Sequence, residues 1–199
     1  MDKASESLFR STLHDMANIL AGIRGIVDLS DPDQPLPRRD RERLEAAFEE
    51  GNSILRRCRH LAMDTLPTAA LEPGAEWRDR LLEEIAPLAT LFRRECQLDL
   101  EAAPQWDQWP GPRMRALAHA ITRQVLPYAK DGPMAIVCVA TAEAWRIRWS
   151  PVQQLPDQLV QAPGHPPLDT CGQWAAAIAA DLGATLSLSD GALEARIPR

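Results

Sequence analysis

Glycine is scarce in this sequence, which holds 10 glycines against 17 prolines in 199 residues. Folds that bind nucleotides use glycines to let the backbone approach phosphate closely, so the shortage counts against a phosphate cradle. Cysteine is rare as well. The four cysteines are widely spaced and form no CxxC pattern: Cys58, Cys96, Cys138 and Cys171. That spacing disfavours a zinc site and a disulfide framework, and it favours reduced thiols in a cytoplasm.

Long apolar runs and an excess of positive charge are also missing. No run approaches the roughly 20 residues that a membrane helix needs. The N-terminal segment, MDKASESLFRS, is polar and lacks the hydrophobic stretch of a signal peptide, so we expect a cytoplasmic protein with no membrane partner. The net charge of -6 argues against nucleic acid as a partner. The remaining composition is that of an ordinary globular protein.

Residues 1–66 are predicted to form an antiparallel hairpin of two helices, because apolar residues recur at spacings of three and four. In the first helix, from about Ser5 to Leu29, they are Phe9, Leu13, Met16, Leu20, Ile23 and Val27. In the second, from about Arg43 to Asp64 with Asp40 as its cap, they are Leu44, Ala47, Phe48, Ile54, Leu55, Cys58 and Leu61. One hairpin cannot bury both stripes, so we expect a homodimer whose two hairpins complete a four-helix bundle.

Residues 67–76 are expected to be a linker, and residues 77–199 to form a second domain. The patterns predict helices over 77–94, 112–129 and 171–182, and strands over 96–100, 134–140, 145–149, 184–189 and 193–198. This order, α-β-α-β-β-α-β-β, predicts a two-layer sandwich, which makes the chain α+β. Tryptophans are expected to fill the sandwich core or pack beside it: Trp77, Trp106, Trp109, Trp145, Trp149 and Trp174.

One group of residues on the first helix can carry chemistry. His14 and Asn18 lie one helical turn apart and share a face. Small residues continue that face: Ala21, Gly22 and Gly25. A neutral imidazole is a nucleophile, and a neighbouring carboxylate such as Asp15 can orient the ring and accept its proton. The alternative interpretation is a surface histidine that happens to lie beside a surface aspartate.

Other charged residues indicate weaker candidates. A group of basic residues on the second helix forms either a basic rim that contacts an acidic partner or a solvated face paired with Glu49 and Glu50: Arg56, Arg57, Arg59 and His60. His119 is interpreted as a core or edge histidine of its helix, and His165 as an exposed loop residue.

The His-Asp-x-x-Asn pattern on a dimerising hairpin, followed by a sandwich of this order, resembles the bacterial sensor histidine kinases. In that family the histidine is phosphorylated, the next acidic residue acts as a base, and the Asn or Thr assists. The resemblance implies these roles for His14, Asp15 and Asn18. Residues 81–88 and 181–186 are similar to segments of the kinase ATP-binding domain. Kinases usually have proline after the Asn, where this chain has Ile19.

The nucleotide-binding residues of those kinases have no counterpart here. Arg123 lies about where the metal-binding Asn belongs, and a cation there would repel Mg²⁺. The Asp-x-Gly-x-Gly motif is replaced by residues 149–154, Trp-Ser-Pro-Val-Gln-Gln, and the last Gly-x-Gly by residues 170–173, Thr-Cys-Gly-Gln. The region of the kinase lid is rich in prolines: Pro151, Pro156, Pro163, Pro166 and Pro167. The glycines that this sequence lacks are therefore those that would surround ATP.

A kinase scaffold that keeps the histidine and lacks the nucleotide site resembles the histidine phosphotransferases of the ChpT type. The resemblance implies a homodimer that relays a phosphoryl group between His14 and the Asp of response regulator receiver domains. It implies no ATP and no cofactor, with Mg²⁺ only in the receiver. The receiver-docking residues would be Arg10, Ala21, Gly22, Gly25, Arg56 and Arg59. Two alternatives stay open: a non-catalytic pseudo-kinase that binds and inhibits a receiver or kinase, and a divergent active histidine kinase.

Overall fold

The computed structural model describes residues 3–31, 33–62, 65–68, 70–102, 107–129, 132–152 and 170–199. The side chains of residues 3–8 and 62 are outside this description. So are His165, Trp106 and the prolines at 156, 163, 166 and 167, so the interpretations given to these residues are not tested.

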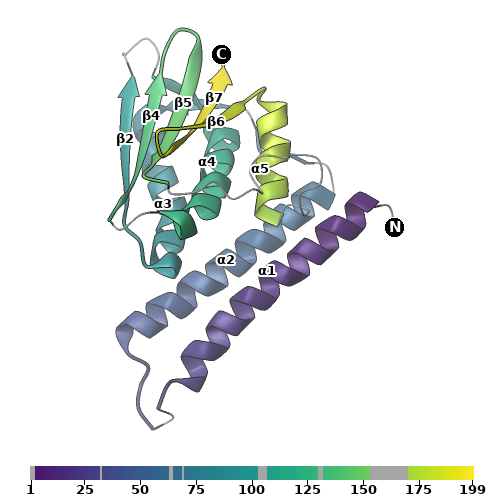
Figure 1. Ribbon diagram of the computed structural model, residues 1–199, viewed down its shortest axis with the longest axis vertical. Coiled ribbons are helices and arrows are strands. Elements are labelled where there is room, and N and C mark those ends of the chain that lie inside the picture. Colours follow the sequence, from purple (N-terminus) through teal and green to yellow (C-terminus); the bar gives the residue numbers. More distant parts are fainter. Residues whose placement is uncertain are drawn as a thin grey trace.

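The N-terminal part is a helical hairpin. Helices α1 (Lys3–Asp28) and α2 (Arg38–Ala62) run side by side in opposite directions (Figure 1). The second helix begins earlier than predicted, so Asp40 lies inside its first turn and is not its cap. A small buried cluster joins the two helices and consists of Ile19 of α1 with Ala47 and Ile54 of α2. No helix in the described part of the chain is long and apolar enough to cross a membrane.

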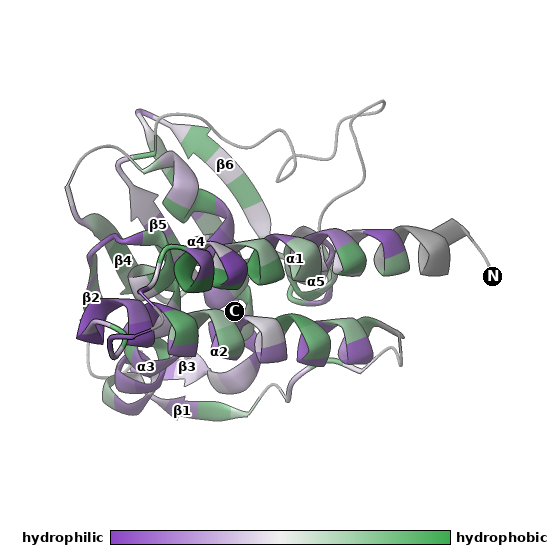
Figure 2. Ribbon diagram, turned by 90° about the horizontal axis from the view of Figure 1, so that it is seen from below, coloured by the Kyte–Doolittle hydropathy of each residue, from purple (hydrophilic) through white to green (hydrophobic). Residues whose placement is uncertain are grey.

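A row of apolar side chains on the hairpin is not buried within one chain. Figure 2 shows apolar and polar residues alternating along both helices. Six large apolar residues are more than half exposed: Phe9, Leu13, Leu20, Val27, Phe48 and Leu55. Phe48 and Leu55 were expected on the inner face of the second helix, and in the single chain that expectation is wrong. Ala47 and Ile54, expected on the same face, are buried as predicted.

The C-terminal part has two layers, and its secondary structure order matches the one that the sequence predicts, apart from two additional three-residue strands and a short 3-10 helix. Its strands and helices are β1 (Leu71–Pro73), α3 (Gly74–Phe92), β2 (Cys96–Ala102), β3 (Gln108–Pro110), α4 (Gly111–Val125), the 3-10 helix η2 (Leu126–Tyr128), β4 (Met134–Ala140), β5 (Ala144–Ser150), α5 (Thr170–Asp181), β6 (Thr185–Ser189) and β7 (Ala192–Pro198). Five strands form one sheet in the order β2-β4-β5-β7-β6. Only the β2–β4 pair is parallel. Helices α3, α4 and α5 pack on one face of this sheet (Figure 1).

The segment 67–76, expected to be a linker, is partly ordered structure. Strand β1 within it pairs with β3 in an antiparallel two-stranded sheet, and α3 begins at Gly74. These strands have three residues each, too few for an alternating pattern to be visible in the sequence.

Four of the described tryptophans are buried in the core, and Trp145 packs beside it, as predicted. Trp77 and Trp109 are fully buried and stack with ring centroids 5.0 Å apart. The buried Trp149 donates its Nε1–H to Thr122 Oγ1 at 2.9 Å, so its one polar atom is satisfied. Trp174 is buried, and Trp145 is only partly buried.

A buried carboxylate joins the hairpin to the sandwich. Glu50 on α2 has a side chain only 1% exposed. Its Oε1 accepts hydrogen bonds from Arg57 Nη2 of the same helix at 3.0 Å and from Arg123 Nε of α4 at 2.5 Å. Both arginine side chains are themselves mostly buried. One carboxylate therefore compensates two cations at this interface, which makes it costly to remove.

We expect Glu50→Gln to lower the free energy of unfolding by about 3 kcal/mol, because the buried guanidinium groups of Arg57 and Arg123 then lose the carboxylate that they share. The neighbouring Glu49 is exposed, so Glu49→Gln on the same helix is the matched control and should change stability by less than about 0.5 kcal/mol. Urea unfolding followed by circular dichroism measures both values. Equal losses in the two variants would show that the buried ion pairs do not hold the interface.

Candidate functional site

His14 lies on α1 with its side chain 72% exposed. The side-chain amide of Asn18, one turn further along, is 3.2 Å from His14 through an Nδ2···Nδ1 contact. The spacing of four residues predicted this pairing, because residues i and i+4 share a helix face. Nothing in the described residues bonds to Nε2 of His14, so this ring nitrogen is open to an incoming group.

Asp15 is next to His14 in sequence but lies in a different environment. Its side chain is only 3% exposed, and its Oδ1 is 3.8 Å from His14 Nδ1. Its Oδ2 accepts a hydrogen bond at 3.1 Å from the backbone N–H of Thr170, the first residue of α5. Asp15 was expected on an edge adjoining His14, and the structure places it in the contact between the hairpin and the sandwich.

Two neighbours compete for Nδ1 of the His14 ring. When Asn18 donates to Nδ1, the proton of the neutral ring sits on Nε2 and the outer nitrogen is not nucleophilic. When Nδ1 carries the proton, Asp15 is the acceptor that would hold it, after the ring closes the present 3.8 Å separation. The second tautomer leaves the Nε2 lone pair facing outward. The site can therefore hold a nucleophilic imidazole, and the position of Asp15 relative to Nδ1 decides how strongly that tautomer is favoured.

The stripe of small residues beside His14 faces open space. Ala21, Gly22 and Gly25 are exposed. A Cβ added at Gly22 or Gly25 would meet no atom within 4 Å, and neither residue has a positive φ. The fold of this chain therefore does not require glycine at these two helical positions, where glycine costs about 1 kcal/mol relative to alanine.

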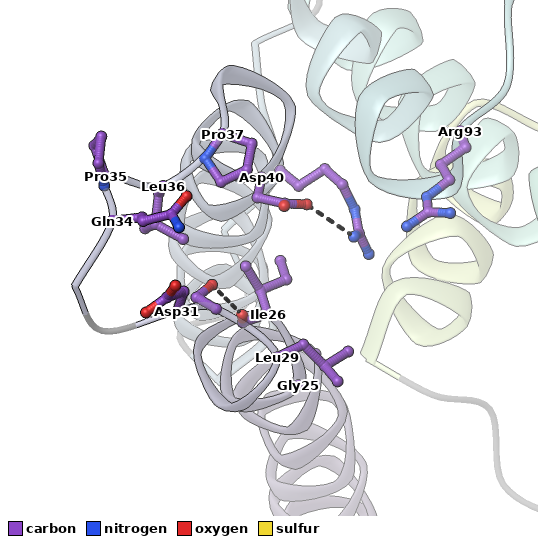
Figure 3. Close-up of a pocket in the computed structure, with 13 residues that line it drawn as sticks. Gly25, Ile26, Leu29, Asp31, Gln34, Pro35, Leu36, Pro37, Asp40 and Arg93 are labelled. Atoms are coloured by element: carbon purple, nitrogen blue, oxygen red, sulfur yellow. Dashed lines mark hydrogen bonds and ion pairs between the residues drawn. The ribbon is translucent and has the colours of Figure 1, made fainter.

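A hollow runs along this stripe toward the sandwich. Gly22 and Gly25 line a cavity of about 490 Å³ at the end of the hairpin, and Arg93 reaches toward it from the end of α3 (Figure 3). A second hollow of about 340 Å³ lies between Asn18 and Gly22 on one side and Leu91 and Phe92 of α3 on the other. The surface next to His14 is thus concave, with walls from both parts of the chain.

The predicted basic residues divide into two groups. Arg10, Arg56 and Arg59 are exposed, as a partner contact requires. Arg57 is buried and binds Glu50, so the solvated-face interpretation is wrong for this ion pair. His60 stacks on Trp174 of α5 with ring centroids 5.5 Å apart and so belongs to the interface with the sandwich.

The segment that resembles the metal-binding helix of the kinases also faces the hairpin. His119 Nδ1 on α4 is 3.3 Å from Arg57 Nη1, and Arg123 binds Glu50. Burial and the nearby arginines Arg57, Arg123 and Arg56 lower the pKa of His119 to about 3. His119 is thus neutral near pH 7 and accepts the arginine N–H, which agrees with the interpretation as an edge histidine.

Sequence reasoning missed the residues that hold Asp15. The hydroxyl of Thr170 shares hydrogen bonds with Thr12 Oγ1 at 3.1 Å and Ser11 Oγ at 3.4 Å. Gln173 of α5 donates to Ser11 Oγ at 3.0 Å. The one feature of the sequence that could have indicated this contact is the position of Ser11 and Thr12, just before His14 on α1. Their partners are more than 150 residues away in the sequence, so no local pattern reveals the contact.

Comparison with known proteins was made through sequence and through structure. No protein-family model and no curated protein sequence matches this chain. Among solved structures, the histidine kinase AdeS of Acinetobacter baumannii superposes with a TM-score of 0.55 and 15% identity, over 92% of this chain and 94% of that one. A bacterial phosphotransferase superposes with a TM-score of 0.54 and 10% identity, over 98% of this chain and 97% of that one.

Both similarities span the helical hairpin and the sandwich together. At identities of 15% and 10% they establish the fold and not the activity. The chain has the fold of histidine kinases and of a bacterial phosphotransferase, as the resemblance in its sequence predicted.

Proposed function

We propose that this protein is a homodimeric histidine phosphotransferase of two-component signalling. It relays a phosphoryl group between the Asp of a response regulator receiver and His14, without binding ATP. The observation that supports this most strongly is the highly exposed imidazole of His14, set beside two helical glycines that face open space.

The chemistry needs little from this chain. The Nε2 lone pair of His14 attacks the phosphorus of the receiver's aspartyl phosphate, so a P–N bond forms as the P–O bond to the carboxylate breaks. Asp15, whose Oδ1 lies 3.8 Å from Nδ1, accepts the Nδ1 proton once the ring has moved closer, and Asn18 supplies a neutral hydrogen-bonding group one turn away. Mg²⁺ and the acidic pocket belong to the receiver, and this chain supplies the nucleophile and its support.

Docking is supported by shape and charge. The concave surface along Gly22 and Gly25 lets a partner backbone approach α1 closely. Arg10, Arg56 and Arg59 are exposed, and positive side chains of this kind favour an acidic receiver surface. Ala21 continues the stripe and adds only a methyl group to it.

The absence of ATP binding is part of the proposal and rests on the contacts of α4. Arg123, which lies about where the kinases have a metal-binding Asn, is engaged by Glu50 of the hairpin. Trp149, at the end of β5 where the Asp-x-Gly-x-Gly motif is expected, is fully buried in the core. A nucleotide and its Mg²⁺ would have to displace both the buried ion pair and a core tryptophan.

The homodimer is supported by the exposed apolar row on the hairpin. Leu13, Leu20 and Val27 recur every seven residues on α1, as in helices that pack against a partner helix. His14 and the glycine stripe lie on roughly the opposite side of α1, by the rotation of about 100° per residue. A second hairpin seated on the apolar row would therefore leave both His14 residues accessible.

The first prediction tests the phosphoryl acceptor. A panel of receiver domains, each charged with radiolabelled acetyl phosphate, should transfer label to the wild type, whereas label on His14→Gln should fall to background because the nucleophile is gone. Radiolabelled ATP should leave both proteins unlabelled. Equal labelling of the variant would refute His14 as the acceptor. Receiver binding without any labelling would favour the pseudo-kinase, and labelling by ATP would favour the kinase.

The second prediction separates docking from folding at Gly22. We expect Gly22→Ala to raise the free energy of unfolding by about 1 kcal/mol, since alanine is the better helix former. The added methyl should at the same time weaken receiver binding about tenfold by overpacking the contact. Ala86→Gly, on the exposed side of α3 and away from α1, should do the reverse for stability and leave binding unchanged. Calorimetry and thermal unfolding report both effects, and unchanged binding by Gly22→Ala would place the docking surface elsewhere.

The third prediction concerns assembly. Leu20→Glu should convert a dimer to a monomer, because it places a charge in the centre of the apolar row. Leu188, a leucine of β6 that is also substantially exposed, provides the control: Leu188→Glu should remain dimeric. Light scattering coupled to size-exclusion chromatography measures the mass. A wild-type monomer at micromolar concentration would contradict the dimer.

A further inference from the structure

The contact between α5 and α1 places a residue of the sandwich directly behind the proposed phosphoryl acceptor. Asp15 Oδ2 accepts the backbone N–H of Thr170, and the same carboxylate presents Oδ1 toward His14 Nδ1. Asp15 therefore links Thr170 of the C-terminal part to the reactive ring. We propose that Thr170 is a positioning residue for phosphotransfer, which fixes Asp15 and through it the tautomer of His14.

The contact is built from several bonds and is shielded from water. Asp15, Thr12, Ser11 and Thr170 are all buried. The Thr170 hydroxyl is shared with Thr12 and Ser11, which anchors the first turn of α5 on α1. Gln173, in that same turn, donates to Ser11. The N-terminus of a helix also carries a partial positive charge, so the first turn of α5 is a favourable place for a carboxylate.

The charge and rotamer of Asp15 matter because they decide which nitrogen of His14 is protonated. A carboxylate fixed behind the ring favours the proton on Nδ1, and this keeps the lone pair on the exposed Nε2. Without the bond from Thr170 the carboxylate loses one of the contacts that hold it behind the ring, and this favours the alternative in which Asn18, 3.2 Å from Nδ1, donates to that nitrogen. The amide then donates to Nδ1, the proton moves to Nε2, and the ring loses its nucleophile.

This inference rests on the proposed function, because the tautomer of His14 affects phosphotransfer only if His14 accepts a phosphoryl group. The first measurement, of the tautomer itself, does not require that function. The ring tautomer is visible in the absence of any receiver, from the nitrogen chemical shifts of His14 in NMR spectra of the full chain. We expect wild-type His14 to carry its proton mainly on Nδ1, and Thr170→Pro to move it toward Nε2. Proline removes the N–H that donates to Asp15 and is tolerated in the first turn of a helix.

Reactivity is measured with phosphoramidate, a small donor that needs no docking surface. The histidine nitrogen attacks phosphorus, a P–N bond forms, and ammonia leaves. Thr170→Pro should slow phosphorylation of His14 by roughly ten- to a hundredfold. Thr170→Ser keeps both the N–H and the hydroxyl and should restore the wild-type rate. Thr170→Ala keeps the N–H and should lie between them. Thermal unfolding of each variant shows whether the fold is retained.

A double-mutant cycle distinguishes positioning from a structural role. In an Asp15→Ala background, Thr170→Pro should have no further effect on the rate, because the carboxylate through which it acts is absent. Additive losses would overturn the proposal, as would an unchanged tautomer and rate in a folded Thr170→Pro protein. If receivers fail to label the wild type while the tautomer still depends on Thr170, the proposed function fails and the positioning contact stands.

Discussion

The carboxylate of Glu50 is the constraint on which the arrangement of this molecule depends. A buried anion needs compensation, and here two arginines from different parts of the chain supply it. Because Arg57 belongs to the hairpin and Arg123 to the sandwich, the ion pairs hold the two parts in one orientation. Once α4 is fixed on α2, α5, which packs beside α4, meets α1 at the turn that carries Asp15. The surroundings of His14 on α1 therefore depend on the ion pairs of Glu50 on α2.

Charge and exposure are divided between neighbouring residues of the site. His14 is exposed and Asp15 is buried, although they are consecutive in sequence. On a helix, consecutive residues point about 100° apart, so one can face a partner while the other faces the protein interior. This division lets one helix present a reactive ring to solvent and still hold its supporting carboxylate in a defined environment. Two adjacent exposed residues would not provide that fixed support, since exposed side chains sample several rotamers.

Much of the fold was predictable from periodicity, and the failures have physical causes. The five strands of the main sheet and the five long helices follow alternation and helical spacing, which are properties of local sequence. Strands β1 and β3 are held by pairing with each other and have too few residues to show a pattern. Phe48 and Leu55 have the helical spacing of a buried stripe, but spacing alone does not say whether the covering surface belongs to the same chain.

Prediction of the candidate site from the sequence was limited in the same way, because local patterns do not reveal contacts between distant residues. His14, Asn18 and the glycine stripe were found because they lie within a few turns of one helix. The bond from Thr170 to Asp15 joins residues 155 positions apart, and Thr170 was noticed only as part of a missing glycine motif. What matters at Thr170 is its backbone N–H, which every residue except proline possesses. A sequence therefore cannot mark such a donor by residue type.

The segments at the positions of two missing nucleotide motifs, 119–124 and 170–173, lie where the sandwich meets the hairpin. Arg123 and His119 on α4 contact Glu50 and Arg57, and the first turn of α5 contacts Ser11, Thr12 and Asp15. Glycine would be a poor choice in such an interface, because it offers no side chain for ion pairs or hydroxyl bonds. The scarcity of glycine thus agrees with a sandwich that supports the histidine helix directly, with polar side chains in place of a phosphate cradle.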